Sequence, residues 1–202
     1  MAFWIVASVC TDLFERLRGG NPLERARLLP RAMVGMMVAH LGVAAFIIGV
    51  TMVKGHEVER DVKMDVGDTT EVRGYTFTFK GVSDVTGPNY VAARATIEVS
   101  RDGRMLRTMH PEKRMYRVQQ NPMTEADIDT GFTRDLYVSL GEPIEGSQGA
   151  WIVRVYFKPF VDWIWGGCLL MALGGLLAAT DRRYRAKVRS EQGASSIVGA
   201  SA

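Results

Sequence analysis

The feature that most constrains this chain is a run of 22 residues, Ala32 to Val53, that contains no Asp, Glu, Lys or Arg. As a helix rising about 1.5 Å per residue, such a run crosses the roughly 30 Å hydrocarbon layer of a bilayer. A second run, Trp163 to Thr180, is uncharged over 18 residues and follows Asp162. The sequence therefore predicts two complete transmembrane helices, over residues 32–53 and 159–180.

The amino terminus is apolar from Phe3 to Cys10, which is too short to cross a bilayer. It lacks the basic lead-in and the small-residue cleavage site of a signal peptide. We interpret residues 1–14 as the end of a transmembrane helix whose beginning is missing, followed by a basic loop over residues 15–31. The chain is then expected to be one product of a split gene or a fragment of a longer polypeptide.

Basic residues collect beside the predicted helices. Residues 11–31 carry five arginines, and residues 181–189 carry four arginines and one lysine. Because such flanks stay in the cytoplasm, we expect the loop over 15–31 and a flexible tail over 181–202 to be cytoplasmic. Residues 54–158 then form a periplasmic domain on a multi-pass protein of a bacterial inner membrane. The net charge of +3 mostly reflects these flanks, so membrane lipid is an expected partner and nucleic acid is not.

Between the apolar runs, apolar residues recur at every second position, which is typical of strands with one buried face. The strand candidates are Val58–Met64, Tyr75–Phe79, Val91–Val99, Met105–Met109, Arg114–Val118, Asp135–Leu140 and Trp151–Phe157. Asp102-Gly103 predicts a tight antiparallel hairpin, and further turns are expected at 86–89 and 141–143. About seven strands in roughly 100 residues favour a small antiparallel β-barrel or sandwich built as a meander. The predicted fold class is thus an α + β membrane protein.

The predicted β-domain has no catalytic constellation. It contains His56 and His110 but no cysteine, and no serine in a GxSxG context, so neither a metal site nor acyl-transfer chemistry is indicated there. Glu142 and Glu145 are interpreted as solvated residues of a turn. Cys10 and Cys168 lie in apolar segments with no CxxC motif, so a thiol relay is not expected.

His40 lies eight residues inside the first complete apolar run, about 12 Å from its cytoplasmic end. An ionisable ring near the middle of a bilayer is unfavourable unless it is paired or coordinated, so this histidine indicates a function. The structural alternative is an interhelical hydrogen bond to a hydroxyl or carbonyl group, worth about 1 kcal/mol. The side chains one helical turn away are all apolar, a surface suited to a flat haem: Met36, Met37, Val43 and Ala44.

We therefore predict that His40 binds a b-type haem as an axial ligand of its iron. A six-coordinate b-type haem needs a second ligand, which we expect outside this chain. His56 lies beyond the membrane boundary and His110 lies in the β-domain. His56 is interpreted as a solvated residue, with a role toward a haem propionate or iron left open.

Two further features of the predicted helices are interpreted as packing. Gly35, Gly42 and Gly49 recur every seven residues and predict close approach of a neighbouring helix. Aromatic residues around the start of the second helix are interpreted as an interfacial belt, with stacking on a haem edge as the alternative. They are Phe157, Phe160, Trp163 and Trp165.

Six motifs occur in order along the chain: MVAHLGVAAFIIG, HPEKRMY, NPMTEADI, RDLYVSLGEP, GAWIVRVYFKPFVDWIWGG and DRRYR. Together they resemble the carboxy-terminal region of the CcmF/NrfE family, the haem lyase subunits of bacterial cytochrome c maturation. The resemblance covers nearly the whole chain, as far as Arg185. It implies a polytopic protein that receives haem from a CcmE-type chaperone and helps attach it to the CxxCH cysteines of apocytochrome c. CcmH/CcmI-type proteins, which handle the apocytochrome, are further implied partners.

The resemblance also implies a b-type haem held by two transmembrane histidines, of which His40 in MVAHLGV matches the later one. The tryptophan-rich periplasmic segment of the family, its two flanking histidines and the other transmembrane histidine have no counterpart in this sequence. The remaining N-terminal part of the lyase, in the same or a separate chain, is therefore an expected partner. This chain alone lacks the full active site, and no catalytic residue is nominated.

Two other functions remain open. The chain could be a non-catalytic membrane anchor and docking platform for the haem chaperone or the apocytochrome, with all haem chemistry elsewhere. It could also be a membrane-tethered periplasmic adaptor unrelated to haem, an idea that rests on the layout of two helices and a β-domain alone.

Overall fold

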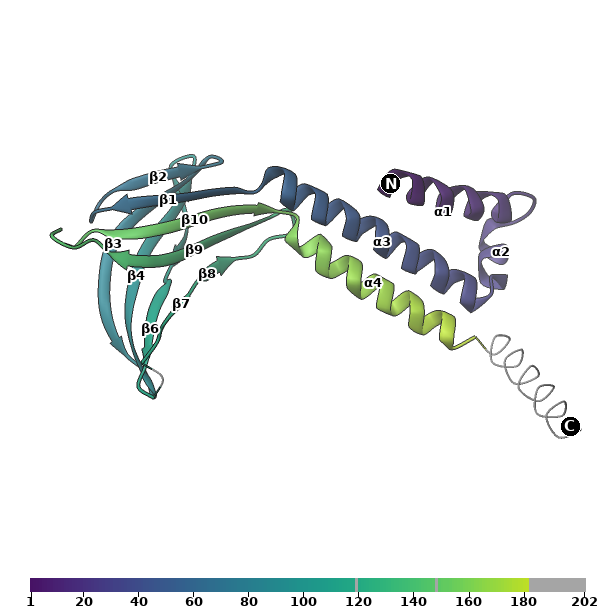
Figure 1. Ribbon diagram of the computed structural model, residues 1–202. Coiled ribbons are helices and arrows are strands. Elements are labelled where there is room, and N and C mark those ends of the chain that lie inside the picture. Colours follow the sequence, from purple (N-terminus) through teal and green to yellow (C-terminus); the bar gives the residue numbers. More distant parts are fainter. Residues whose placement is uncertain (119, 148, 182–202) are drawn as a thin grey trace, which may run out of the picture. The chain divides into compact units, whose positions relative to one another are not determined.

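The computed structural model describes residues 1–118, 120–147 and 149–181, and the chain divides into two compact units (Figure 1). One unit combines residues 1–51 with the segment that begins at Trp163, and it is helical. The other unit, Met52–Asp162, contains the strands of the described residues, the last residues of one helix and the first two residues of another. The predicted tail over 181–202 lies outside the described residues except for Asp181.

The helical elements are α1 (Ala2–Leu17), α2 (Pro22–Leu28), α3 (Arg31–His56) and α4 (Val161–Ala179). By length and composition, α3 with 26 residues and α4 with 19 residues are able to cross a membrane. The predicted loop over 15–31 is partly helical, since it contains α2. Asn21 begins α2 by accepting a hydrogen bond from the Leu23 backbone N–H, and Pro22 fits the first helical position.

Helices α3 and α4 pack through glycine, which confirms the predicted helix contact. A Cβ atom added to Gly42 would lie 2.7 Å from the carbonyl oxygen of Gly167, and one added to Gly167 would lie 2.7 Å from that of Gly42. Gly35 makes the same reciprocal contact with Gly174, seven residues before Gly42 on α3 and seven residues after Gly167 on α4. Gly49 is also buried. Only glycine lets two helix backbones approach this closely.

The carboxyl end of α4 meets the amino end of α3. The carboxylate of Asp181 accepts a hydrogen bond of 2.9 Å from the backbone N–H of Ala32, in the first turn of α3. Asp181 is buried. Because the first N–H groups of a helix lack partners within the helix and carry partial positive charge, this carboxylate stabilises the antiparallel pair.

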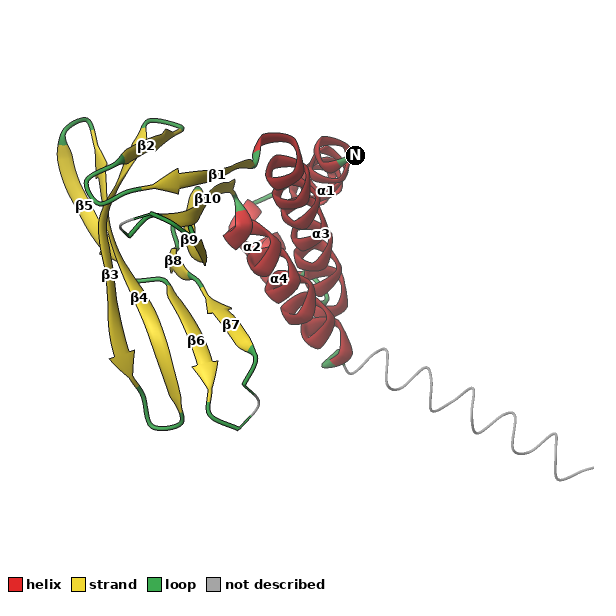
Figure 2. Cartoon of the chain, turned by 60° about the vertical axis from the view of Figure 1, so that its left-hand side comes forward, coloured by secondary structure: helices red, strands yellow, loops and turns green. Residues whose placement is uncertain are grey.

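The β-unit is an antiparallel sandwich of two sheets (Figure 2). One sheet has the order β1-β10-β9-β8, and the other has the order β2-β3-β4-β6-β7, with β5 paired to β4. The strands are β1 (Val58–Met64), β2 (Thr69–Val72), β3 (Tyr75–Thr86), β4 (Tyr90–Arg101), β5 (Arg104–Met109), β6 (Glu112–Tyr116), β7 (Pro122–Glu125), β8 (Asp127–Asp129), β9 (Arg134–Pro143) and β10 (Trp151–Pro159).

The core lies between the two sheets, where alternating side chains from both inner faces meet. Its buried members are Met64, Val72, Tyr75, Phe77, Phe79, Ala95, Ile97, Val99, Met109, Leu136, Val138, Leu140, Val153 and Val155. The predicted period-two runs supply most of this core. The predicted hairpin at Asp102-Gly103 is also confirmed, because both residues have positive φ and join β4 to β5.

The structure differs from the sequence expectation in three places. The strands do not form a simple meander, because β1 pairs with β10, and β4 pairs with β3, β5 and β6. Val91 is half exposed rather than buried, while its neighbour Ala92 is buried, because the pairing of β3 with β4 shifts register between Phe79 and Val82.

The third difference concerns Glu142. The expected turn at 141–143 is instead the end of β9, so Glu142 is a strand residue. Its carboxylate forms an ion pair with Lys113 of β6, whose ammonium group also donates to the carbonyl of Gly141 at 3.3 Å. The residues Gly-Glu-Pro are typical of a turn, so the local sequence predicts one. The pairing of β9 with β10 overrides that preference. Glu145 does lie in a turn.

Candidate functional site

His40 lies on α3, and its side chain is exposed in this chain. Its Nδ1 atom is 2.8 Å from the backbone carbonyl oxygen of Met36, one turn earlier in the helix. A carbonyl oxygen only accepts hydrogen bonds, so Nδ1 carries the proton and donates it. In the neutral ring the lone pair is then on Nε2, the nitrogen farther from the backbone.

This geometry is compatible with metal ligation through Nε2. A histidine that ligates through one ring nitrogen almost always donates the other N–H to a carbonyl or carboxylate, which fixes the tautomer and the ring orientation. The Met36 carbonyl fills that role here. If a haem were bound here, His40 would hold its iron through Nε2, so the residue present fits one half of a bis-histidine site.

The face of α3 that carries His40 is not the face that contacts α4. At about 100° per residue, His40 lies about 140–160° around the helix from Gly35 and Gly42, which touch α4. Met36, beside His40, is 46% exposed. Of the other apolar neighbours predicted for a haem, Met37 and Ala44 are buried within the helical unit, so they do not extend the exposed surface.

The remaining histidines lie elsewhere. His56 ends α3, sixteen residues after His40, which is about 24 Å along the helix axis. His110 is an exposed residue following β5, and its backbone N–H donates to Asp127 at 2.7 Å. Within the described residues, no three His, Cys, Asp or Glu side chains gather in a way that would hold a metal ion.

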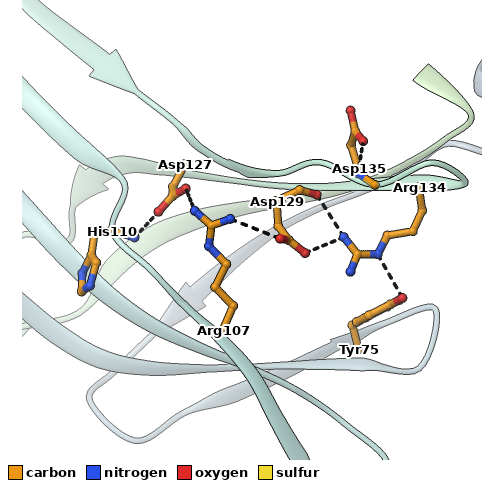
Figure 3. A network of polar contacts seen from close by, with 8 residues as sticks. Tyr75, Arg107, His110, Asp127, Asp129, Arg134 and Asp135 are labelled. Carbon is orange, nitrogen blue, oxygen red and sulfur yellow. Dashed lines mark hydrogen bonds and ion pairs between the residues drawn. The ribbon is translucent and has the colours of Figure 1, made fainter. Parts of the chain in front are cut away.

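A chain of charged residues crosses the β-unit from β5 to β3 through β8 and β9 (Figure 3). Arg107 contacts Asp127 at 3.4 Å and Asp129 at 3.2 Å. Asp129 also pairs with Arg134 at 2.5 Å, and the Nε of Arg134 donates to the hydroxyl of Tyr75 at 3.1 Å. Burial alone would lower the pKa of Arg134, but its hydrogen bonds to Tyr75 and Asp129 raise it.

Glu112 of β6 is buried between two arginines. Its carboxylate accepts hydrogen bonds of 2.6 Å from Arg94 and 2.7 Å from Arg114. Burial would raise the pKa of Glu112, but these hydrogen bonds outweigh it and hold the pKa below its usual value. Arg114 also lies 4.5 Å over the ring of Tyr90. This cluster ties β4 to β6 and is structural.

Sequence reasoning missed these arrangements because their members come from distant strands. Tyr75 and Arg134 are 59 residues apart, and no local spacing connects them. Asp135, beside Arg134, is buried and accepts a hydrogen bond from the Gly131 N–H at 3.1 Å. Burial raises the pKa of this carboxyl.

Known proteins match this chain closely. Residues 55–159 match the family described as the CcmF C-terminal beta-sandwich. The chain is 52% identical over 190 residues to the cytochrome c-type biogenesis protein CcmF of Pseudomonas aeruginosa, a match that covers 94% of this chain and 29% of that protein. The CcmF of Escherichia coli is 51% identical over 198 residues, which are 98% of this chain and 29% of the relative.

The fold also has a counterpart among solved structures. The structure of a protein titled cytochrome c heme lyase CcmF superposes with a TM-score of 0.67 over 88% of this chain and 29% of that chain. The sequence identity in that comparison is 20%, so it concerns the fold alone.

The fold defines the class of protein: an antiparallel β-sandwich carried between two helices that are long and apolar enough to cross a membrane. The chain belongs to the CcmF family of cytochrome c-type biogenesis proteins, which confirms the resemblance seen in the sequence motifs. It spans 29% of the length of the P. aeruginosa and E. coli relatives.

Proposed function

We propose that this chain is the carboxy-terminal portion of a cytochrome c haem lyase subunit in the bacterial inner membrane, and that His40 is one axial ligand of a membrane-embedded b-type haem. The observation that carries the proposal is the geometry of His40. Its Nδ1–H is held by the Met36 carbonyl, and its ring is exposed on the face of α3 away from the glycine contact.

The exposed apolar surface of the helices supports a membrane location. On α4, Trp165, Leu169 and Leu176 are each more than 60% exposed. Apolar side chains in such a continuous helix are stable when lipid or further helices cover them. The basic residues near both cytoplasmic ends support an orientation with the β-unit in the periplasm.

An exposed imidazole in the middle of an apolar helix needs a partner in the assembled protein. Exposure of the imidazole to lipid is unfavourable. A further helix that carries the second axial ligand would cover the ring. The remaining N-terminal part of the lyase is the proposed source of that helix. When bound, haem would supply the one-electron chemistry, while this chain orients one ligand and excludes water around it.

The β-unit is proposed to bind partners. A CcmE-type haem chaperone, CcmH/CcmI-type proteins and apocytochrome c are the candidates that follow from the family. In the described part of the domain, the clustered charged side chains form ion pairs with one another. These clusters do not place a nucleophile beside a base, so a binding role fits them better than a catalytic one.

The test uses a chimera in which this chain replaces the matching segment of the E. coli relative. The matched variants are His40→Ala and Leu41→Ala, which truncate adjacent residues of α3 that are both exposed. The b-type haem that copurifies with each protein is measured from its reduced absorption spectrum. We expect His40→Ala to lose most of the haem and Leu41→Ala to keep it.

The competing function, an anchor and docking platform, predicts a different pattern. In that case His40→Ala would keep both haem and cytochrome c maturation, while deletion of residues 58–157 would abolish maturation. Such a result would overturn the ligand assignment. Absence of haem absorbance from the unmodified, folded chimera would favour the adaptor unrelated to haem.

A further inference from the structure

A cavity of about 350 Å³ opens in the β-unit beside the last turn of α3. Its lining combines three arginines, a histidine and a hydroxyl-bearing tyrosine with apolar side chains. The lining residues are Met52, His56, Arg73, Tyr75, Arg101, Thr133, Arg134, Phe157 and Pro159. No carboxylate is among them.

Tyr75 organises two of the arginines. Arg101 and Arg134 donate to its hydroxyl at 3.0 and 3.1 Å, and their guanidinium carbons lie 4.9 and 5.1 Å from the centre of its ring. Figure 3 shows Arg134 between Asp129 and Tyr75. Arg134 is therefore partly neutralised by Asp129, whereas the ion pair that Arg101 makes within the described residues is with the exposed Asp102, at 3.8 Å.

Arg73 is the least neutralised of the three arginines. It is exposed, and it forms no ion pair with any residue in the described parts of the chain. Arg73 and Gly74 both have positive φ, 52° and 78°, in the tight turn that joins β2 to β3. A left-handed conformation is unfavourable for a non-glycine residue, so this turn places an arginine at the cavity in spite of backbone strain.

Several other lining residues of the cavity lie close in the sequence to the ends of the two long helices. Met52 and His56 belong to the last turns of α3, and Pro159 comes two residues before α4 begins at Val161. If α3 and α4 span the bilayer, the cavity lies at headgroup level. A lining that combines arginines with apolar side chains suits an anionic group attached to a hydrocarbon chain.

A haem on His40 cannot fill this cavity. The axial distance of about 24 Å between His40 and His56 exceeds the reach of haem propionates from the iron. The cavity is therefore separate from any haem held by His40.

We propose that this cavity binds the phosphate of an anionic phospholipid of the outer leaflet of the inner membrane. Arg73 and Arg101 contact the phosphate, and the acyl chains lie along Met52 and Phe157. Arg134 and Tyr75 position the site. This assignment is independent of whether His40 binds haem.

The test uses the full chain purified in a neutral detergent. Native mass spectrometry measures retained phosphatidylglycerol and phosphatidylcholine with the same acyl chains. We expect a preference for phosphatidylglycerol that falls about 25-fold in the double variant Arg73→Gln/Arg101→Gln, or about fivefold per arginine. The matched control, Arg60→Gln/Arg117→Gln, removes the same charge from exposed positions outside the cavity and should keep the preference.

Three outcomes would overturn the proposal: equal retention of the two lipids, an unchanged preference in the cavity variant, or an equal loss in the control. Excess inorganic phosphate is added to distinguish a lipid ligand from free phosphate. If it displaced all of the bound phosphatidylglycerol, the cavity would be a site for free phosphate and not for lipid. Circular dichroism establishes that the variants are folded. His40→Ala should retain as much phosphatidylglycerol as the unmodified chain. A failure of the lipid proposal can therefore be distinguished from a failure of the proposed haem function.

Discussion

Gly35 of α3 and Gly174 of α4 pack backbone against backbone. A Cβ atom on Gly35 would lie 2.4 Å from the Gly174 carbonyl oxygen, and one on Gly174 would lie 2.5 Å from the Gly35 carbonyl oxygen. The contact recurs at Gly42 and Gly167, so the two helices share a continuous seam. This seam leaves the His40 face of α3 available to another helix.

Gly174→Leu should separate the helices and destabilise the helical unit by about 3 kcal/mol, because the added side chain collides with backbone atoms of α3. The matched control is Gly175→Leu, whose Cβ would meet nothing within 4 Å. It should change stability by less than about 0.5 kcal/mol. Unfolding of the purified chain in mixed detergent measures both. Equal effects of the two substitutions would contradict the seam.

Glu112→Gln should destabilise the β-unit by about 2 kcal/mol, because the buried carboxylate neutralises Arg94 and Arg114. Glu98→Gln, which removes a partly exposed partner of Lys80, serves as the control and should cost less than about 0.5 kcal/mol. The folded-state pKa of Glu112 lies below its ordinary value of 4.5. Its contribution to stability is therefore fully present above pH 4.5 and is lost as the pH falls through the folded-state pKa.

That pH dependence is measured by thermal unfolding of the original chain and of Glu112→Gln from neutral to acidic pH. The difference between their unfolding midpoints should shrink below pH 4.5. A difference that stays constant down to acid pH would show that the carboxylate charge is not what stabilises the cluster.

Asp135→Asn should stabilise the β-unit at neutral pH. Burial raises the folded-state pKa of Asp135 above 3.8, so ionisation of this carboxyl increasingly opposes folding as the pH rises from 3.8 to that raised pKa, and fully opposes it above. Asparagine keeps an acceptor for the Gly131 N–H without the charge. The gain in unfolding midpoint should disappear below pH 3.8, where the carboxyl is protonated in both states. A loss of stability at neutral pH would refute this account.

The strands of the core were predictable because their pattern is local. Tyr75, Phe77 and Phe79 alternate with polar residues, and Asp102-Gly103 has the turn chemistry that a tight hairpin needs. The glycine seam on α3 was predictable for the same reason, since a spacing of seven places Gly35 and Gly42 on one face.

The pairings between distant segments were not predictable. The contact of β1 with β10 joins the two ends of the domain, and the short strands β2, β7 and β8 lack an alternating apolar run. Likewise, Arg73, Arg101 and Arg134 meet only because their strands end near one another. The tautomer of His40 depends on a ring orientation that the sequence does not specify.

The most direct measurement of the central claim is electron paramagnetic resonance of the ferric haem in the chimera with the E. coli relative. If His40 Nε2 is an axial ligand, the original chimera has a low-spin signal, and His40→Gly loses it. Added imidazole, entering the space left by the side chain, should restore that signal in His40→Gly. Leu41→Gly controls for the effect of glycine on α3 and should stay low-spin without imidazole. An unchanged low-spin signal in His40→Gly without imidazole would contradict the assignment of His40 as a haem ligand.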